Sequence, residues 1–267
     1  MFGNLTRVGS NFHAEEAWTN LKKVNGQIGQ IQSRLSTGKR INSAEDDTSG
    51  YALAKHLEGR TRGLSQALDN VGTAKNVLNI AEGGYQSQMS ILQTMKEKAT
   101  QAADGSWSAA QRGAIDDQVS ALELEFADIA TDTTFNDTAL FGSTTTFQVG
   151  AGASDTLAVA LNASASVSVD LSTAAGATTA IGTIDTAIST LSESIQNVGD
   201  FQARLSSKEE SLSLAISNTD ATRSRIEDAD FAKEQMSMMK LSILQQTTIG
   251  SFAQANSSAQ MVLALFQ

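Results

Sequence analysis

The sequence predicts a mainly α-helical protein, a long helical coiled-coil bundle with a small β-hairpin region. Its 267 residues contain no proline, which would interrupt a helix, and only 5% aromatic residues, too few for a bulky globular core. Over most of the chain apolar residues recur at alternating spacings of three and four, as in coiled-coil helices. Between residues 144 and 171 the apolar period changes to two, which is typical of short strands.

The first helix is predicted to end at Gly38, because glycine readily adopts the left-handed backbone conformation that follows a helix end. Asn42 or Ser43 can start the next helix, since Ser43 with Asp46 three residues later fits a capping pattern. The apolar seam of the first helix consists of Leu21, Val24, Ile28, Ile31 and Leu35.

A long second helix is predicted from about Ser43 to Ala103, and it has the most regular seam in the chain. Gln88 is the only polar member of that seam, and alanine occupies many of its positions, so partner helices must approach closely. The seam consists of Leu64, Ala67, Val71, Ala74, Leu78, Ala81, Tyr85, Gln88, Leu92, Met95, Ala99 and Ala102.

A shorter amphipathic helix is predicted after a turn at residues 103–106. Ser108 and Gln111 resemble a capping box at its start. Its apolar positions follow the same alternating spacing of three and four, which indicates one packed face. They are Ile115, Val119, Leu122, Phe126 and Ile129.

Short strands or a hairpin are predicted for residues 144–171, with a first turn at residues 150–155. Ser, Thr, Ala and Gly dominate this region, so a disordered linker is the alternative. The alternating apolar residues are Phe147, Val149, Leu157, Val159, Leu161, Val167, Val169 and Leu171.

Helical periodicity resumes with a heptad seam from Ile181 to Thr219 and returns in the last stretch of the chain, where Leu241–Gln267 carry no charged side chain. Burial of the seven apolar seam residues of this tail would contribute on the order of 1.5–3 kcal/mol each. Ordering 27 residues costs on the order of 1–2 kcal/mol each in backbone entropy. A solitary tail helix should therefore not hold, and we expect this segment to fold when it docks among copies of itself.

The charge distribution and the distribution of apolar residues argue against three classes of protein. The net charge is −10, and residues 113–203 contain twelve acidic and no basic side chains, so the basic stripe of a nucleic-acid-binding protein is missing. No apolar stretch approaches the ~20 residues of a membrane span. The N-terminus lacks the basic and apolar regions of a cleaved signal peptide.

No residue pattern indicates a catalytic, cofactor or metal site, so we expect neither enzymatic activity nor a cofactor. His13 and His56 lie far apart and outside any His-Glu-x-x-His arrangement. Met236, Met238 and Met239 could suggest a soft-metal site, but the chain has no cysteine and no histidine near them, which favours a packing role.

Three stretches resemble bacterial flagellins. RLSTGKRINSAEDDTSGYALA at residues 34–54 and SRIEDADFAKEQMSMMKLSILQQTTIGSFAQANSSAQMVLALF at residues 224–266 are similar to the two flagellin signatures. TFNDTALFG at residues 134–142 is similar to the turn that leads into the flagellin β-region. The resemblance implies a structural protein that polymerises into the bacterial flagellar filament for swimming motility.

The resemblance also implies an antiparallel arrangement in which the two termini pair as an inner helical layer. We expect residues 1–38 and 231–267 to form this inner terminal domain and residues 39–142 and 180–230 to form the helical bundle outside it. Residues 143–179 would be a short β-rich region in place of the large outer domains of many flagellins.

The partners that the resemblance implies are other copies of the chain, the type III flagellar export apparatus with a chaperone, the filament cap and the hook-associated junction proteins. The expected location is extracellular, in the flagellum. Thr94 and Lys98 replace an arginine and a leucine of the patch that the innate-immune flagellin receptor reads, which argues against recognition by that receptor.

The expected assembly interface combines apolar seams of the inner layer with two clusters of charged residues. The clusters flank the points where inner helices meet outer ones. We hypothesise that they lock adjacent subunits in register by electrostatic complementarity; the alternative is a pair of solvated loops. The residues are Leu21, Val24, Ile28, Ile31, Arg34, Arg40, Asp46, Asp47, Arg223, Arg225, Glu227, Asp228, Leu241, Leu244, Phe252, Val262 and Phe266.

Three other functions are alternatives to that of a filament subunit. A hook–filament junction protein shares similar ends, but such proteins tend to have proline after the Asp-Asp pair, where this chain has Thr48. An enzyme built on a flagellin frame would need a catalytic insertion that the short centre lacks. A cytoplasmic coiled-coil adaptor predicts no export.

Overall fold

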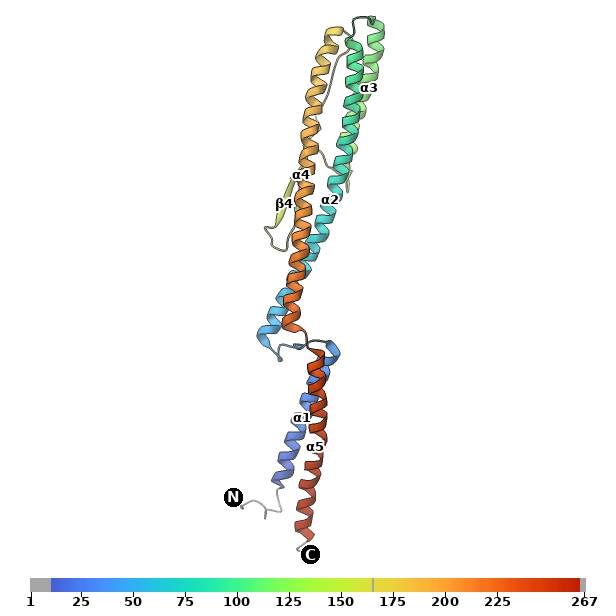
Figure 1. Ribbon diagram of the computed structural model, residues 1–267. Helices are drawn as coiled ribbons and strands as arrows, with labels where there is room; N and C mark the ends of the chain where they lie inside the picture. The colour runs from blue at the N-terminus through green and yellow to red at the C-terminus, as the bar shows by residue number, and fades with distance from the viewer. Residues whose placement is uncertain (1–10, 165, 265–267) are drawn as a thin grey trace. The chain divides into compact units, whose positions relative to one another are not determined.

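The computed structural model describes residues 11–164 and 166–264 (Figure 1). The chain divides into two compact units: unit 1 comprises residues 1–59 and 219–267, and unit 2 comprises residues 60–218. The predicted mainly α-helical fold class with a small β-hairpin region is confirmed. The helices are α1 (Phe12–Thr37), α2 (Thr48–Ala103), α3 (Ala109–Asp132), α4 (Ala174–Glu227) and α5 (Phe231–Ala264). The strands are β1 (Thr134–Phe135), β2 (Thr138–Ala139), β3 (Thr144–Gln148) and β4 (Thr156–Ala160).

The core of unit 2 forms where α2, α3 and α4 pack along their apolar seams. Every predicted seam residue of α2 is buried, and even Leu64 has only 6% of its surface exposed. The partners from α3 are Ile115, Val119 and Phe126, and those from α4 are Ile184, Leu191, Val198, Leu205 and Leu212. The heptad interpretation of these three helices is therefore confirmed.

The hairpin β3–β4 lies beside the helices of unit 2 (Figure 1). Its strands pair antiparallel from Thr144 opposite Ala160 to Gln148 opposite Thr156. Val149 N–H donates to Asp155 O at 2.8 Å and closes the turn predicted at residues 150–155. Val149, Leu157 and Val159 alternate inward onto the core, so the prediction of a hairpin here is confirmed.

A polar layer crosses the core of unit 2 at Tyr85 and Gln88 of α2. Tyr85 Oη donates to Asn162 O at 2.6 Å, and Gln88 Nε2 donates to Phe126 O at 3.0 Å and to Ser164 Oγ at 2.8 Å. Burial raises the pKa of Tyr85 to about 12. These bonds fix the segment that follows β4 against α2 and α3, because a buried polar group is costly unless it is paired.

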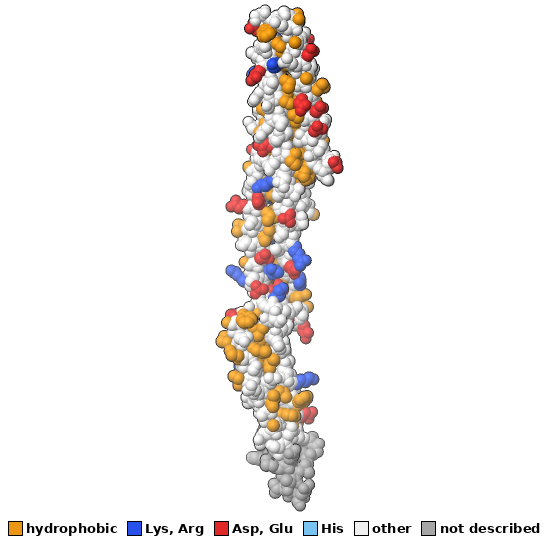
Figure 2. Space-filling view, turned by 90° about the vertical axis from the view of Figure 1, so that its right-hand side faces the viewer, with side chains coloured by type: hydrophobic (Ala, Val, Ile, Leu, Met, Phe, Trp, Pro, Cys, Tyr) orange, Lys and Arg blue, Asp and Glu red, His pale blue; other side chains and the backbone are white. Residues whose placement is uncertain are grey.

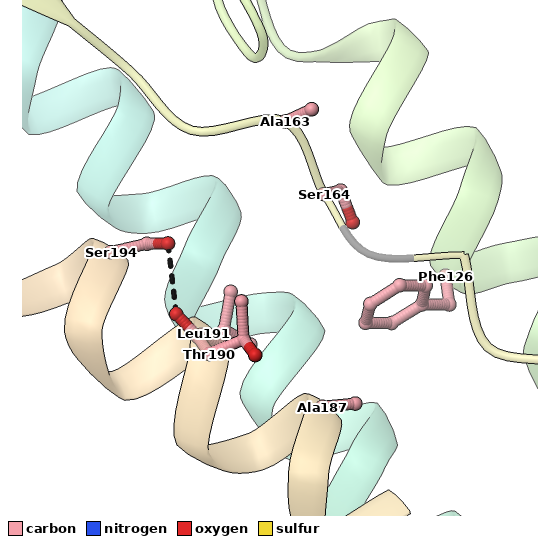
Figure 3. A pocket seen from close by; sticks show the side chains of 7 residues that line it. All are labelled: Phe126, Ala163, Ser164, Ala187, Thr190, Leu191 and Ser194. Carbon is pink, nitrogen blue, oxygen red and sulfur yellow. Dashed lines mark hydrogen bonds between the residues drawn. The ribbon is translucent and has the colours of Figure 1, made fainter. Parts of the chain in front are cut away.

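A small pocket lies next to this layer, between α3, α4 and the segment after β4 (Figure 3). The ring of Phe126 and the hydroxyl of Ser164 line it opposite the side chains of α4, where Ser194 Oγ donates to Thr190 O at 3.0 Å. Its other lining residues are Ala163, Ala187 and Leu191.

The predicted third strand run at Val167–Leu171 is wrong: residues 166–171 form no strand. Their backbone donors bind carboxylates of α3 instead of a neighbouring strand. Val169 N–H donates to Glu123 Oε1 and Leu171 N–H donates to Asp116 Oδ1, both at 2.7 Å. Val167 and Leu171 are still buried, so the apolar alternation correctly marked an inward-facing segment.

The start of α2 also differs from the prediction, which placed it at Ser43. Asp46 Oδ2 accepts from the backbone N–H groups of Asn42 and Ser43, so its side chain closes a turn instead of capping a helix. Asp47 Oδ1 accepts Gly50 N–H at 2.9 Å, as an N-cap residue does, and the helix begins at Thr48. The predicted capping box of Ser108 and Gln111 at α3 is confirmed.

Two adjacent glycines of α2 allow a matched test of close packing. A Cβ on Gly84 would lie 2.7 Å from Thr133 Oγ1 and 2.8 Å from Phe141 Cζ, whereas a Cβ on Gly83 meets nothing within 4 Å. Gly84→Ala is expected to lower the free energy of unfolding by about 1–3 kcal/mol. Gly83→Ala should raise it by about 0.5–1 kcal/mol, because alanine is the better helix former. Urea denaturation measures both, and equal effects of the two variants would contradict this packing.

The Glu123 carboxylate predicts a dependence of stability on pH. Burial raises its pKa above the ordinary value, the Val169 hydrogen bond opposes this, and the charge of Asp116 adds to it. The folded state therefore holds the proton more tightly, so stability falls as pH rises through the folded pKa. Glu123→Gln keeps an acceptor oxygen, so it should flatten this dependence and raise Tm at pH 7. Glu125→Gln, on the exposed side of α3, is the control, and a lower Tm for Glu123→Gln would contradict the prediction.

Candidate assembly interface

The terminal helices α1 and α5 pair antiparallel in unit 1 and lie side by side (Figure 1). Their contacts run in opposite directions along the two helices, although the partners are more than 190 residues apart in sequence. Asn11 also caps α1, since its side chain accepts Ala14 N–H. The contacts are Asn11 Nδ2 to Ala255 O at 2.9 Å, Trp18 to Phe252 with ring centroids 6.0 Å apart, Gln245 Nε2 to Asn25 Oδ1 at 2.7 Å, and Arg34 to Glu234 at 3.5 Å.

The predicted seam of α1 faces this contact only partly. Ile31 is buried, and Leu21, Val24 and Ile28 are half-buried. The pairing of two helices therefore shields one side of α1 and leaves the other side open.

The predicted apolar positions of α5 divide in the same way. Leu241 and Phe252 are half-buried, whereas Leu244 is 41% exposed. Val262 lies within α5, but its side chain is outside the described part of the chain, and Phe266 lies outside the described residues altogether.

Unit 1 exposes many large hydrophobic side chains. Nine of those described in unit 1 are exposed, compared with four in unit 2, which is the larger unit. Figure 2 shows hydrophobic side chains gathered over the terminal helices. An exposed apolar surface of this kind marks a site of interaction with another protein surface. The nine are Phe12, Trp18, Leu53, Phe231, Met236, Met239, Ile243, Leu244 and Ile249.

A backbone clasp joins the break between α1 and α2 to the break between α4 and α5. Arg40 N–H donates to Glu227 O at 2.7 Å, and Ala229 N–H donates to Gly38 O at 2.9 Å. Gly38 has a φ of 71° and ends α1 as the sequence predicts. The clasp fixes which residues of α1 and α5 stand opposite each other.

Charged side chains from both predicted clusters meet at this clasp, within one chain. Lys39 Nζ lies 2.8 Å from Glu227 Oε1, and Glu227 is only 5% exposed. Arg40 donates to Ile226 O at 2.8 Å, and the backbones of Lys39 and Asp228 form an antiparallel bridge. The pairing was not foreseen from the sequence, which placed these clusters only between subunits.

The other predicted charged residues lie close to the clasp. Gln30 Nε2 donates to Asp46 Oδ1 at 2.8 Å, and this bond and the backbone N–H of Asn42 hold the pKa of Asp46 below its ordinary value. Asp47 caps α2, Arg223 lies 3.4 Å from Asp220, and Arg225 and Asp228 are exposed.

The net charge of the protein is carried entirely by unit 2. Unit 1 contains eleven basic and eleven acidic side chains, whereas unit 2 contains eight basic and eighteen acidic ones. Close contact between copies of unit 1 is therefore not opposed by a net charge.

Neither a membrane-spanning helix nor a metal-binding cluster occurs in the part of the chain that the structure describes. None of its helices is long and apolar enough to cross a bilayer. Nor does any group of three or more His, Asp or Glu residues in this part of the chain lie close enough together to hold a metal ion.

Comparison with known proteins identifies the family. The bacterial flagellin N-terminal helical region matches residues 8–146, and the bacterial flagellin C-terminal helical region matches residues 181–266. The chain belongs to the bacterial flagellin family. It is 31% identical to flagellin FlaB1 of Treponema pallidum and 32% identical to the flagellar filament core protein flaB2 of Brachyspira hyodysenteriae. Both alignments cover 97% of this chain and 99% of the relative.

One further relative agrees with this membership, and one solved structure is similar to part of the chain. A flagellin of Halalkalibacterium halodurans is 32% identical over the same shares of the two chains. The crystal structure of Bacillus cereus flagellin is 26% identical, with a TM-score of 0.44 over 57% of this chain and 88% of that one. As a flagellin, this protein is a structural subunit of the flagellar filament, and the alternative of a hook–filament junction protein is not supported.

Removal of one partner of the clasp ion pair should loosen the clasp. Lys39→Ala leaves the Glu227 carboxylate buried without its cation, at a cost of about 1–2 kcal/mol because the pair is partly exposed. Amide hydrogen exchange at Arg40 and Ala229 should accelerate accordingly.

The control for this prediction is Lys55→Ala, which breaks the more exposed pair with Glu58 and should cost about 0.5 kcal/mol or less. Unchanged exchange at Arg40 and Ala229 in the Lys39→Ala variant would show that the ion pair does not hold the clasp.

Proposed function

We propose that the chain polymerises through unit 1 and that its terminal helices, residues 1–38 and 231–267, build the inner layer of the flagellar filament. The bundle of residues 39–142 and 180–230, with the short β-rich residues 143–179, forms the next layer outwards. Rotation of the resulting filament would drive swimming.

The observation that carries this proposal is the apolar surface that the pair of α1 and α5 leaves uncovered. Burial of each large apolar side chain contributes on the order of 1.5–3 kcal/mol. Eight of the nine exposed side chains of this kind in unit 1 lie on α1 and α5, so their burial is a strong driving force for association. The balanced charge of unit 1 allows copies of the same surface to approach one another.

The residues expected from the sequence then divide into two proposed roles. We propose that Leu21, Ile31, Leu241 and Phe252 hold the pair together within each chain, because these side chains are at least half-buried there. Leu244, at 41% exposed, contacts a neighbouring copy. The charged clusters first close the clasp within each chain, and their role between subunits remains a prediction.

The route to the filament is also part of this proposal. The chain passes unfolded through the flagellar type III export apparatus with a chaperone, and it polymerises outside the cell under the filament cap, on the hook-associated junction proteins. Absence of cysteine and proline suits such a passage, because neither disulfides nor slow prolyl isomerisation can trap the chain. The role of the chain is structural and not catalytic.

Deletion of residues 241–267 tests the proposal. The truncated chain should remain a helical monomer, since the core of unit 2 is independent of α5. It should not polymerise, because α1 loses most of its partner. Electron microscopy after seeding with filament fragments, together with circular dichroism, measures both properties.

The full-length chain is the positive control and should form filaments under the same conditions. A second variant, Arg223→Glu with Arg225→Glu, tests the charged cluster: normal filament yield and shape at low salt would exclude a register role between subunits. Filaments of the truncated chain would refute assembly through the terminal helices.

A further inference from the structure

Two methionine side chains stand exposed on the side of α5 that faces away from α1. Met236 is 60% exposed and Met239 is 55% exposed. Ile243, which follows at the next helical spacing, is 64% exposed, so the three residues form one apolar stripe. We call these three residues the methionine stripe.

The opposite side of α5 carries the contacts with α1. Glu234, Gln245 and Phe252 contact Arg34, Asn25 and Trp18, respectively. The spacing of these α5 residues places them about half a turn from the methionine stripe. The stripe is therefore left free when the terminal pair forms.

A second copy of this chain is the occupant that fits the stripe, an argument that depends on the proposed function. Its three side chains are apolar and exposed, and beyond Lys240, where Ile243 lies, the sequence of α5 has no charged side chain, so an apolar surface matches the stripe. The terminal helices of another subunit offer such a surface, with Trp18, Leu244 and Ile249 exposed on them. Unit 1 also lacks a net charge that would repel its own copies.

We propose that Met236 and Met239 are a modification site at which a peroxide controls assembly. The thioether sulfur attacks one oxygen of hydrogen peroxide, an S–O bond forms and the O–O bond breaks, and the proton of the attached oxygen passes to the departing hydroxide, which leaves as water. Each methionine is oxidised by two electrons to a sulfoxide and the peroxide is reduced. The stripe thereby becomes polar at two positions, and the free subunit no longer joins the filament.

Exposure makes the reaction selective within the chain. Met95 is fully buried in unit 2, and Met238 is half-buried on the side of α5 towards α1. Met89 is half-buried as well, so among the methionines whose side chains the structure describes a peroxide reaches the thioethers of Met236 and Met239 first. In an assembled filament the neighbouring copy covers the stripe, so the reaction is restricted to subunits that have not yet assembled.

Peroxide treatment of the full-length chain before and after polymerisation tests this site. Mass spectrometry should find sulfoxide at Met236 and Met239 about tenfold faster than at Met95 in the free chain, and several-fold slower in filaments than in the free chain. Oxidised chains should give about tenfold less sedimentable filament. Treatment with methionine sulfoxide reductase and a dithiol, which is oxidised to a disulfide as the sulfoxide is reduced, should restore the yield.

The double variant Met236→Leu with Met239→Leu keeps the volume and apolar character of the stripe. The yield of this variant before peroxide treatment is the reference for its own response, and peroxide treatment should not lower that yield. The control variants Met95→Leu and Met238→Leu should polymerise but remain as sensitive to peroxide as the natural sequence.

Three outcomes would overturn the inference. They are normal polymerisation of chains that carry both sulfoxides, equal sensitivity of the double leucine variant, and equal oxidation rates in filaments and free chains. In each of these cases untreated chains still polymerise, so the proposed function stands. Failure of the untreated chain to polymerise would instead refute the proposed function, and with it the control of assembly at this stripe.

Discussion

A pair of helices can shield only one side of each member, and the behaviour of unit 1 depends on this geometric limit. α1 and α5 cover Ile31 and partly cover Leu241 and Phe252, while their remaining apolar side chains face outwards. Three or more helices are needed before every apolar face has a neighbour. We propose that other subunits supply the missing neighbours, which would make stability of the terminal pair and assembly of the filament two aspects of one equilibrium.

Unit 2 satisfies the same requirement within a single chain. The seams of α2, α3 and α4 close around a common core, and the hairpin β3–β4 and the segment after it cover the remaining side. Polar groups specify where that segment lies: Tyr85 and Gln88 bind it from α2, and Asp116 and Glu123 accept its N–H groups from α3. The protein therefore has one part whose apolar seams close within the chain and one part that, in our proposal, its neighbours complete.

Much of the fold follows from residue spacing. The seams of α2, α3 and α4, the glycine end of α1 and the capping box of α3 were all predicted, because each depends on residues close together in sequence. The start of α2 was not predicted correctly. Asp46 and Asp47 each lie three residues from the backbone N–H group that they bind, and only the structure shows that Asp47 is the one that caps the helix. The residues around Val169 alternate between apolar and polar as in a strand, but their backbone N–H groups bind carboxylates of α3 and not a neighbouring strand.

The assembly site was harder to predict than the fold. α5 carries apolar residues on two sides, one through Leu241 and Phe252 and the other through Met236, Met239 and Ile243. Periodicity identifies both sides but does not say which one meets α1. The clasp was missed for a similar reason, because Lys39 and Glu227 are 188 residues apart and no local pattern links them.

The uncharged sequence of α5 beyond Lys240 has a consequence for the setting in which such a filament works. None of its side chains gains or loses a proton between acid and alkaline conditions. Contacts made through amides, hydroxyls and hydrocarbon groups there keep the same strength when a swimming cell crosses from one acidity to another. Sensitivity to acidity is left to titratable side chains elsewhere in the chain, among them Asp46 and Glu123.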